Sequence, residues 1–133
     1  MLIYPDACVL IYLLEEHAEM YPGIDRKLRA TGNLTLALSE LTRLECRIRP
    51  MRQLDWNLLS RFDRFFSNPG HIYIPASRPV FNLATELRAM HNLKTPDALH
   101  LAAALHGGCD QFWTNDHRFE KAADGRIDIV TFS

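Results

Sequence analysis

The stretch Thr95-Pro96-Asp97-Ala98-Leu99-His100-Leu101-Ala102-Ala103-Ala104-Leu105 indicates how this chain folds. Thr95 is a favourable N-cap and Pro96 a favourable first helical residue, so a helix is expected to begin here. His100 is the only polar residue from 98 to 105, and other elements must therefore cover most of the helix. Asp97 falls in the first turn, where free amides and the helix dipole favour an anion. Alone, this acid only stabilises the helix start. A role of Asp97 in a functional site becomes the better explanation if further carboxylates lie at the same place.

Composition indicates one globular domain. The 133 residues are 47% hydrophobic and 23% charged, which suits one substantial core and is unlike disordered or fibrous chains. The longest apolar run, residues 7–14, is too short to cross a bilayer, and the N-terminus lacks the basic start of a signal peptide. We therefore expect a single domain over residues 1–133, cytoplasmic and without membrane contact. Three isolated cysteines argue against a disulfide framework and against a zinc site.

Strands alternate with helices along the chain. Short apolar runs predict strands near residues 2–4, 34–38, 72–74, 111–114 and 127–132, the last of them at an edge. Helical patterns are expected over residues 7–16, 24–30, 40–49, 54–66, 78–91, 96–105 and 116–122. This alternation predicts the α/β class, as a three-layer α/β/α sandwich with a central, mostly parallel sheet.

The helix after the second predicted strand carries two acids. Ser39 is its expected N-cap and Pro50 its expected end. Glu40 and Glu45 are five residues apart, or about 140° around the axis, so both cannot face one site. A core stripe is expected from three apolar residues, Leu41, Leu44 and Ile48. Glu45 borders this stripe and is therefore the better candidate for facing inward.

Four carboxylates are expected at one edge of the sheet. Asp6 follows the first strand, Asp116 follows the fourth, Glu45 lies on the helix after the second, and Asp97 begins the buried helix. Ligands of parallel sheets bind outside the carboxyl ends of the strands. Each acid alone is explained by a helix cap or an ion pair, but four together repel one another unless a cation compensates. Oxygen ligands without His or Cys suit Mg²⁺ or Mn²⁺ and phosphoryl chemistry, in which the metal activates water.

The pattern around these acids resembles PIN-domain ribonucleases. The matching segments are Asp6 after the first strand, Ser39-Glu40-Leu41-Thr42-Arg43-Leu44-Glu45, Thr95-Pro96-Asp97-Ala98-Leu99-His100-Leu101-Ala102-Ala103-Ala104 and Thr114-Asn115-Asp116-His117-Arg118-Phe119. The length and the last segment are most similar to VapC-type toxins of bacterial toxin–antitoxin pairs. The resemblance covers nearly the whole chain. It implies Mg²⁺- or Mn²⁺-dependent RNA cleavage, inhibition by a cognate antitoxin protein, and a homodimer. It also implies that the metal-binding and catalytic acids are Asp6, Glu45, Asp97 and Asp116, with Thr114 in support.

Two departures from the family pattern surround the first acid. Family members often have a hydroxyl residue and then Asn or Ser after this Asp, whereas Ala7 and Cys8 stand here. Pro5 replaces the usual apolar residue before Asp6 and removes an amide donor from an expected inner strand. No carboxylate is lost, so these departures bear on the efficiency of metal binding.

Several further residues are candidates for supporting roles. Six arginines gather between residues 43 and 64, although the net charge of −1 gives no sign of a polyanionic partner. A solvated helix face is the commoner reason for such a cluster. The candidates for phosphate contact are Asn115, Arg118, Arg43 and Arg47. His100 lies three residues beyond Asp97 on the same face and is a candidate for contact with the site, but a packed, hydrogen-bonded core histidine is the preferred interpretation. The helix over residues 54–66 is the expected contributor to a dimer interface.

Two other classes of function compete with the nuclease. A receiver-like signalling domain also places acids and Mg²⁺ at strand ends, but it needs paired acids after the first strand, which Pro5-Asp6-Ala7 does not offer. A catalytically silent module could keep the same fold in order to bind a protein or an RNA. Because the acids are present in either case, an activity assay must separate the silent module from the nuclease.

Overall fold

Five parallel strands form the central sheet of the structure, a computed structural model that describes residues 1–132. The strands are β1 (Leu2–Pro5), β2 (Thr35–Leu38), β3 (Ile72–Tyr73), β4 (Gln111–Thr114) and β5 (Asp128–Thr131). They lie in the order β3-β2-β1-β4-β5, and each neighbouring pair is parallel. All five predicted strands are confirmed, with β5 at an edge as expected.

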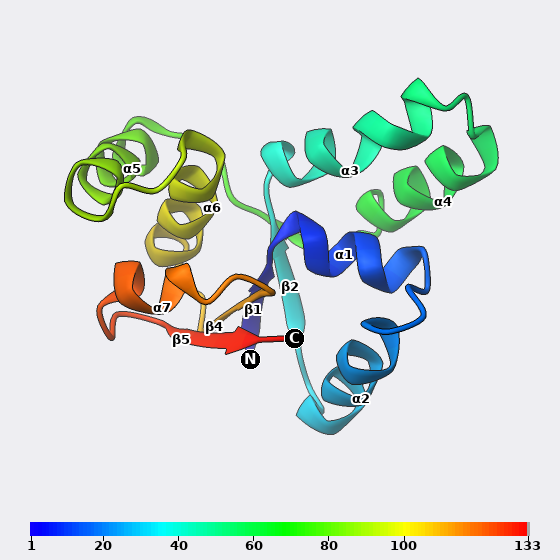
Figure 1. The fold of residues 1–133 in the computed structure, drawn as a ribbon, viewed down its shortest axis with the longest axis horizontal. Coiled ribbons are helices and arrows are strands. Elements are labelled where there is room, and N and C mark those ends of the chain that lie inside the picture. The colour runs from blue at the N-terminus through cyan, green and yellow to red at the C-terminus, as the bar shows by residue number, and fades with distance from the viewer. Residues whose placement is uncertain (133) are drawn as a thin grey trace.

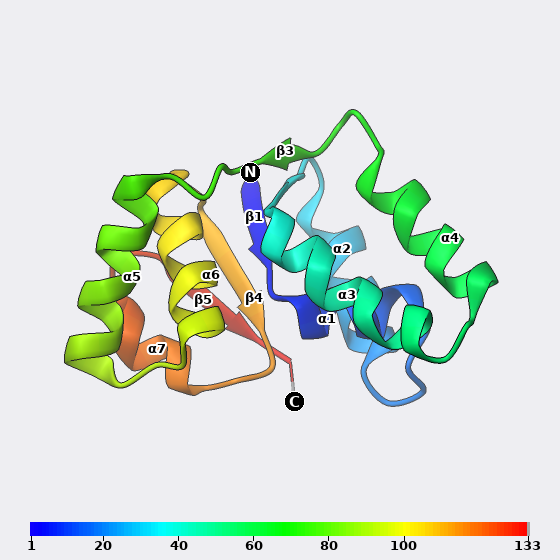
Figure 2. The same cartoon turned by 90° about the horizontal axis from the view of Figure 1, so that it is seen from above.

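Helices cover both faces of this sheet (Figures 1 and 2). Within residues 1–132 they are α1 (Ala7–Leu14), α2 (Tyr21–Thr31), α3 (Glu40–Arg52), α4 (Trp56–Phe66), α5 (Arg78–His91), α6 (Thr95–His106) and α7 (Arg118–Ala123). Residues of α1 to α4 form one core cluster with the sheet, and residues of α5 to α7 form another. The predicted three-layer α/β/α sandwich is confirmed. No helix within residues 1–132 is long and apolar enough to span a membrane.

The strands separate the two cores by the alternation of their side chains. Ile3 and Trp113 belong to the core under α1 to α4, whereas their neighbours Tyr4 and Phe112 belong to the core under α5 to α7. Tyr4 and Phe112 are paired in the β1–β4 register, and their rings stack with centroids 5.6 Å apart. All four side chains are at most 1% exposed. Burial on both faces explains why these strands are apolar runs rather than alternating patterns.

The buried face of α3 differs from the predicted stripe. Leu44 and Ile48 are 53% and 43% exposed, so their assignment to the core is wrong. The buried residues are instead Thr42, Cys46 and Pro50. Their spacing of four residues places them on one face, but two of them are not aliphatic. Hydrophobicity alone therefore marked the wrong side of the helix.

Three helix boundaries also differ from the expectations. Pro50 lies inside α3 rather than ending it, since a proline in the last turn removes only its own N–H bond and the helix closes with the Gln53 amide on the Arg49 carbonyl. The N-cap of α6 is Lys94, and Thr95 is the first helical residue, whose hydroxyl accepts a hydrogen bond from Arg88. α2 begins at Tyr21 rather than at the expected residue 24, because Pro22 fits the first turn of the helix, where the N–H that proline lacks is not needed.

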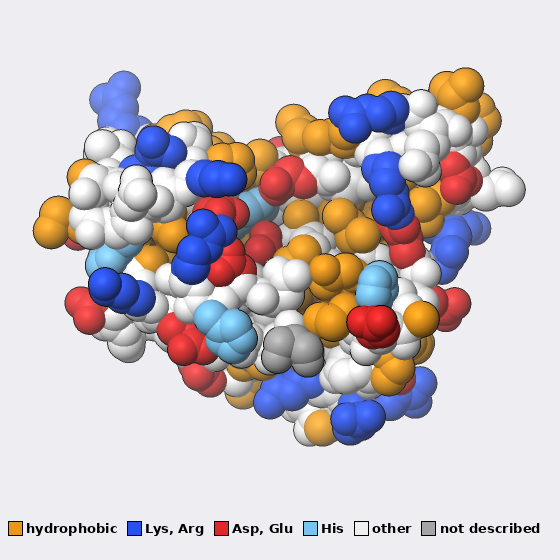
Figure 3. Space-filling model, viewed as in Figure 1, with side chains coloured by type: hydrophobic (Ala, Val, Ile, Leu, Met, Phe, Trp, Pro, Cys, Tyr) orange, Lys and Arg blue, Asp and Glu red, His pale blue; other side chains and the backbone are white. Residues whose placement is uncertain are grey.

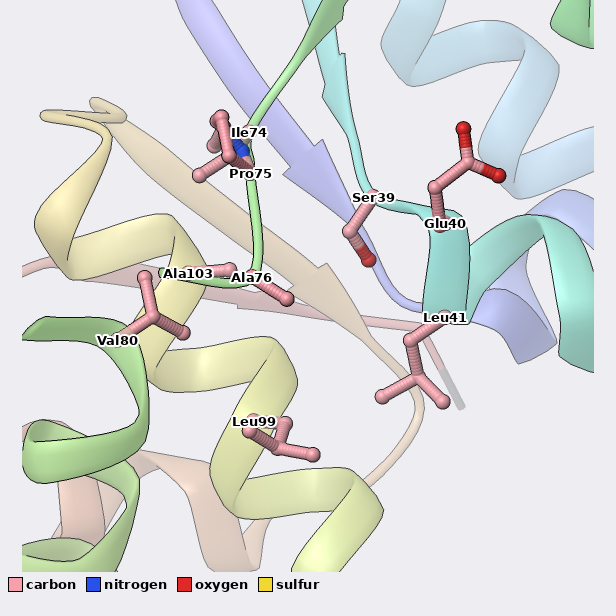
Figure 4. A pocket seen from close by; sticks show the side chains of 9 residues that line it. All are labelled: Ser39, Glu40, Leu41, Ile74, Pro75, Ala76, Val80, Leu99 and Ala103. Atoms are coloured by element: carbon pink, nitrogen blue, oxygen red, sulfur yellow. The ribbon is translucent and has the colours of Figure 1, made fainter. Parts of the chain in front are cut away.

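The beginning of α3 also reaches the opposite helical layer. A small cavity of about 40 Å³ lies between Leu41 of α3, Leu99 of α6 and the segment that follows β3 (Figure 4). Ser39, the N-cap of α3, lies at the same place. This approach of α3 to α6 brings the acids of the two helices to one end of the sheet.

Candidate active site

Asp6 lies at the topological switch point of the sheet, next to β1, where the connections between strands change direction. The chain leaves β1 toward β2, while β4 lies on the other side of β1, so the loops after β1 and β4 separate and leave a crevice. Asp6 is the N-cap of α1, and its Oδ1 accepts a hydrogen bond from the Ala7 amide at 2.8 Å. Its Oδ2 accepts one from the Thr114 hydroxyl at 3.1 Å. The Asp6 amide also donates to the Trp113 carbonyl at 2.7 Å, so the ladder to β4 continues beyond Pro5.

Burial strongly affects the charge of Asp6. Burial raises the pKa of this carboxyl above its ordinary value, and the negative charge of Glu45 raises it further. The hydrogen bonds from Thr114 and Ala7 act in the opposite direction and lower the pKa. The net upward shift means that the ionised form of Asp6 lacks sufficient compensation from this chain alone. A nearby cation would supply it.

Asp97 and Asp116 share the guanidinium of Arg118. Arg118 Nη2 lies 2.5 Å from Asp116 Oδ2 and 3.7 Å from Asp97 Oδ2. Hydrogen bonds from Arg118 hold the pKa of Asp116 below its ordinary value. Burial and the charge of Asp6 raise the pKa of Asp97, which Arg118 only partly offsets. Asp116 is held further by its own amide, which donates to the Thr114 hydroxyl at 3.1 Å.

Glu45 is bound to the core through His100. Glu45 Oε1 accepts a hydrogen bond from His100 Nε2, and His100 Nδ1 bonds to the Tyr4 hydroxyl at 2.7 Å. The Tyr4 hydroxyl also bonds to Ser39 at 2.8 Å and to Thr42 at 3.2 Å. Since Tyr4 can donate its single proton to Nδ1, Nε2 carries the hydrogen that Glu45 accepts.

Sequence reasoning favoured a core position for His100 over a contact with the site. It is buried there at 1% exposure, as predicted, but it also contacts the site. Tyr4 and Thr42 were missed altogether. The signal for Thr42 was a polar residue one helical turn before Cys46 on the buried face of α3, whereas no pattern in the sequence marked Tyr4.

The four predicted acids line one open cavity of about 470 Å³. Asn115 and Arg118 line it as well, as does Cys8. Thr114, fully buried, lies behind the acids that it bonds. In Figure 3 acidic side chains gather in the hollow between the two helical layers. The topology thus brings together residues from four distant parts of the chain.

Cys8 occupies the position where the family pattern has Asn or Ser. Its Sγ donates to Asn115 Oδ1 at 3.1 Å and lies 3.7 Å from Asp6 Oδ2. Burial and the charge of Asp6 raise the pKa of this thiol to about 12, so it stays protonated and able to donate. Asn115 is fixed from its other side by a bond from its Nδ2 to the Tyr12 hydroxyl at 3.1 Å. The thiol therefore supplies a donor at the position where the family pattern has Asn or Ser, while no side-chain donor replaces the hydroxyl expected at Ala7.

Arg43 and Arg47 do not line the acidic cavity. Both pair with Asp63 of α4, Arg47 through Nε at 2.8 Å and Arg43 through Nη2 at 3.9 Å. They line a separate groove together with Glu40, which points away from Glu45 as expected. Their role in phosphate contact stays a prediction.

The residues present fit a hard divalent cation. Within residues 1–132, no three acidic, His or Cys side chains are already close enough to hold a metal ion, because Arg118 draws in Asp97 and Asp116. The Arg118 side chain is 61% exposed and is free to rotate outward. A cation in its place would find only oxygen donors, which Mg²⁺ and Mn²⁺ prefer. It would also compensate the raised pKa values of Asp6 and Asp97.

Comparisons with known proteins agree with this geometry. The model of the family described as PIN domain matches residues 3–125. Among solved structures, VapBC2 from Rickettsia felis bound to a promoter DNA fragment has 19% identity over all of both chains and a TM-score of 0.77. A toxin–antitoxin complex from Klebsiella pneumoniae has 23% identity, covers 97% of this chain and 96% of that chain, and has a TM-score of 0.74.

A third similar structure is VapC20 from Mycobacterium tuberculosis, a toxin that cleaves the sarcin–ricin loop. It has 15% identity, covers 90% of this chain and 94% of that chain, and has a TM-score of 0.75. No curated protein matches the sequence. The resemblance inferred from the sequence motifs is confirmed by the family model, which spans nearly the whole chain. The chain belongs to the PIN domain family.

Proposed function

We propose that this protein is a divalent-metal-dependent endoribonuclease that acts as the toxin of a toxin–antitoxin pair. The observation that carries the proposal is the convergence of Asp6, Glu45, Asp97 and Asp116 on one cavity at the β1–β4 crevice. Membership of the PIN family and the fold shared with a toxin that cleaves RNA support it. The receiver-like alternative has no such support.

The four acids would hold Mg²⁺ or Mn²⁺. When bound, the metal supplies an activated water and neutralises charge on the phosphate during displacement. Asp6 is oriented for this task by the Ala7 amide and the Thr114 hydroxyl. Glu45 is oriented by His100. These supports fix the two carboxylates before any ligand arrives, which reduces the cost of reorganisation.

Asp97 and Asp116 approach the same ligand from the other side of the cavity. Arg118, which pairs with both acids here, has a planar guanidinium that would bind two phosphate oxygens when the acids hold a metal instead. Asn115, fixed between Cys8 and Tyr12, offers a further polar group at the rim. Attack by external water, rather than by the 2′-hydroxyl of the RNA, leaves a 5′-phosphate on the product.

Two protein partners belong to the same proposal. Similar structures include a toxin–antitoxin complex, which supports a cognate antitoxin as partner. For a homodimer, α4 is the proposed contributor, although its Leu59 and Phe62 pack into the core and leave Trp56, at 58% exposure, as its outward apolar residue. Sedimentation of Trp56→Glu tests this: an unchanged oligomeric state excludes α4 from the interface.

Cleavage of total cellular RNA by the purified protein without antitoxin tests the proposed activity. We expect cleavage with Mg²⁺ or Mn²⁺, none with chelator, and products that carry 5′-phosphates. Asp97→Asn should abolish cleavage, whereas Glu86→Gln, which removes an exposed carboxylate on α5, should not. A folded wild-type protein that cleaves no RNA with either metal would instead support the silent binding module.

A further inference from the structure

A second cavity adjoins the acidic one on the side of α5 and α7. It measures about 340 Å³ and lies between the end of α5 and the outer side of α7. Arg118 lines both cavities. The new cavity also follows the segment that leads into Asp97, since Leu93 is among its lining residues. The two cavities therefore adjoin at Arg118, where a chain-like ligand would extend from one into the other.

The groove is basic. His91 and Lys121 line it together with Arg118. His91 lies in the last turn of α5, and Lys121 lies in the last turn of α7. Within residues 1–132 neither Lys121 nor His91 forms an ion pair. Their capacity to bind an anion is thus unused.

The basic residues on the opposite side of the acidic cavity, on α3, already pair with carboxylates. Figure 3 shows Lys and Arg side chains on both sides of the central acidic group. On α3, however, Arg47 and Arg43 pair with Asp63, and Arg49 pairs with Glu15. A phosphate that bound there would have to displace a carboxylate. Within residues 1–132 no ion pair involves Lys121 of the α5–α7 groove, so Lys121 can bind an anion without that cost.

We propose that this groove, lined by His91, Lys121 and Arg118, binds a backbone phosphate of the RNA strand next to the bond that is cleaved. The inference rests on the proposed function, because it takes RNA as the substrate. Lys121 would attract the phosphate as a point charge, and Arg118 would donate bidentate hydrogen bonds to its oxygens. Met90, which is 73% exposed at the groove, offers an apolar surface for the adjoining base.

A site built from carboxylates needs a cationic group nearby if it is to bind and cleave a polyanion. The carboxylates repel the phosphates on either side of the scissile one, and a metal compensates only at the site itself. The unpaired Lys121 in the adjoining groove would offset this repulsion and favour one direction for the strand. The α5–α7 side is therefore the bound side, and the strand should lie across Arg118.

Binding of a fluorescein-labelled, single-stranded oligouridylate of about 12 nucleotides tests the inference. Fluorescence anisotropy is measured with the full chain, with Ca²⁺ in place of Mg²⁺ and with the intact length of the strand checked on a gel. Lys121→Ala should weaken binding by up to about fivefold, as expected for one exposed ion pair. The slope of log affinity against log salt should become shallower by about 0.7, the value for one phosphate contact on a single strand.

Lys27→Ala is the matched control. Lys27 lies on α2, which packs on the other face of the sheet, and its substitution should leave both affinity and salt slope unchanged. Lys121→Glu should weaken binding more than Lys121→Ala. Equal affinity and salt slope for wild type and Lys121→Ala would overturn the inference, as would a wild type that shows no salt-dependent binding.

Cleavage kinetics distinguish this inference from the proposed function. If the wild type cleaves RNA, Lys121→Ala should raise KM by a similar factor and leave kcat unchanged, because Lys121 touches no reacting atom. Active wild type with an unchanged KM in Lys121→Ala refutes the groove alone. Inactive wild type that still binds the oligonucleotide through Lys121 refutes the nuclease and leaves the groove as an RNA-binding site.

Discussion

Replacement of His100 is a sharp test of how the site is organised. The ring bonds Glu45 through Nε2 and the Tyr4 hydroxyl through Nδ1, and it is 1% exposed. His100→Leu keeps most of the buried volume and removes both hydrogen bonds. His100→Gln can keep a donor near the position of Nε2 and so retain the bond to Glu45. The two variants therefore separate packing from the orientation of Glu45.

The size of the effect follows from the partners that remain. In His100→Leu the Tyr4 hydroxyl keeps Ser39 and Thr42, so it is not left without a bond. The half-buried Glu45 can turn to solvent. Two lost hydrogen bonds then lower the free energy of unfolding by about 1–3 kcal/mol. In a chain of this length that corresponds to a fall in Tm of roughly 3–10 °C.

The affinity for a divalent metal should fall as well. Removing a residue that orients a metal ligand typically weakens binding by about 10–100-fold. Isothermal titration with Mn²⁺ measures this, at a temperature where each variant is folded. His100→Gln should recover most of the affinity, and His106→Gln, at an exposed position on the same helix, should bind as the wild type does. Wild-type Mn²⁺ affinity in a folded His100→Leu would refute the positioning of Glu45 by His100.

Three further outcomes are expected. Asp97→Asn should stabilise the metal-free protein, because burial and the charge of Asp6 disfavour the charged form of Asp97. The gain should be only a few tenths of a kcal/mol, since solvent screens this half-exposed group. The same substitution should reduce or remove the rise in Tm that Mg²⁺ produces in the wild type. Burial raises the pKa of Asp6 above 3.8 in the folded protein. The stabilising contribution of the protonated carboxyl is therefore present below pH 3.8 and is lost as the pH rises through the native pKa. In urea unfolding of the metal-free protein, the free energy of unfolding of Asp6→Asn should exceed that of the wild type by an amount that grows with pH. Arg118→Gln should tighten Mn²⁺ binding by up to about fivefold, since it removes a competing cation from Asp97 and Asp116, and titration calorimetry would contradict this if affinity fell.

The architecture was predictable because it depends on local patterns. Apolar runs of three to six residues separated by helical patterns predict a parallel sheet, and a parallel sheet places the carboxyl ends of all its strands at one edge. Asp6 directly follows β1, and Asp116 follows β4 at a distance of two residues. Their convergence therefore follows from chain order alone. The roles of these acids stay predictions, whereas their shared cavity is observed.

The buried polar network was not predictable because its partners are far apart in sequence. Tyr4 bonds residues that lie 35, 38 and 96 positions away. Each is an ordinary polar residue in its own segment. The error on α3 has the same origin: Thr42 is buried because Tyr4 satisfies its hydroxyl, and its burial turns Leu44 and Ile48 outward. A helix whose buried face is partly polar cannot be oriented by hydrophobicity.

The supports of the four acids differ in a way that links the site to the groove. Asp6 is held by neutral donors, and Glu45 is held by a fully buried ring, so neither support can leave without unfolding. Asp97 and Asp116 are held by Arg118, whose side chain is largely in solvent. Among the residues that hold the four acids, Arg118 is thus the one that a divalent cation would have to displace. The residue it displaces already lines the basic groove, so the binding of metal would free the cation that the RNA phosphate needs.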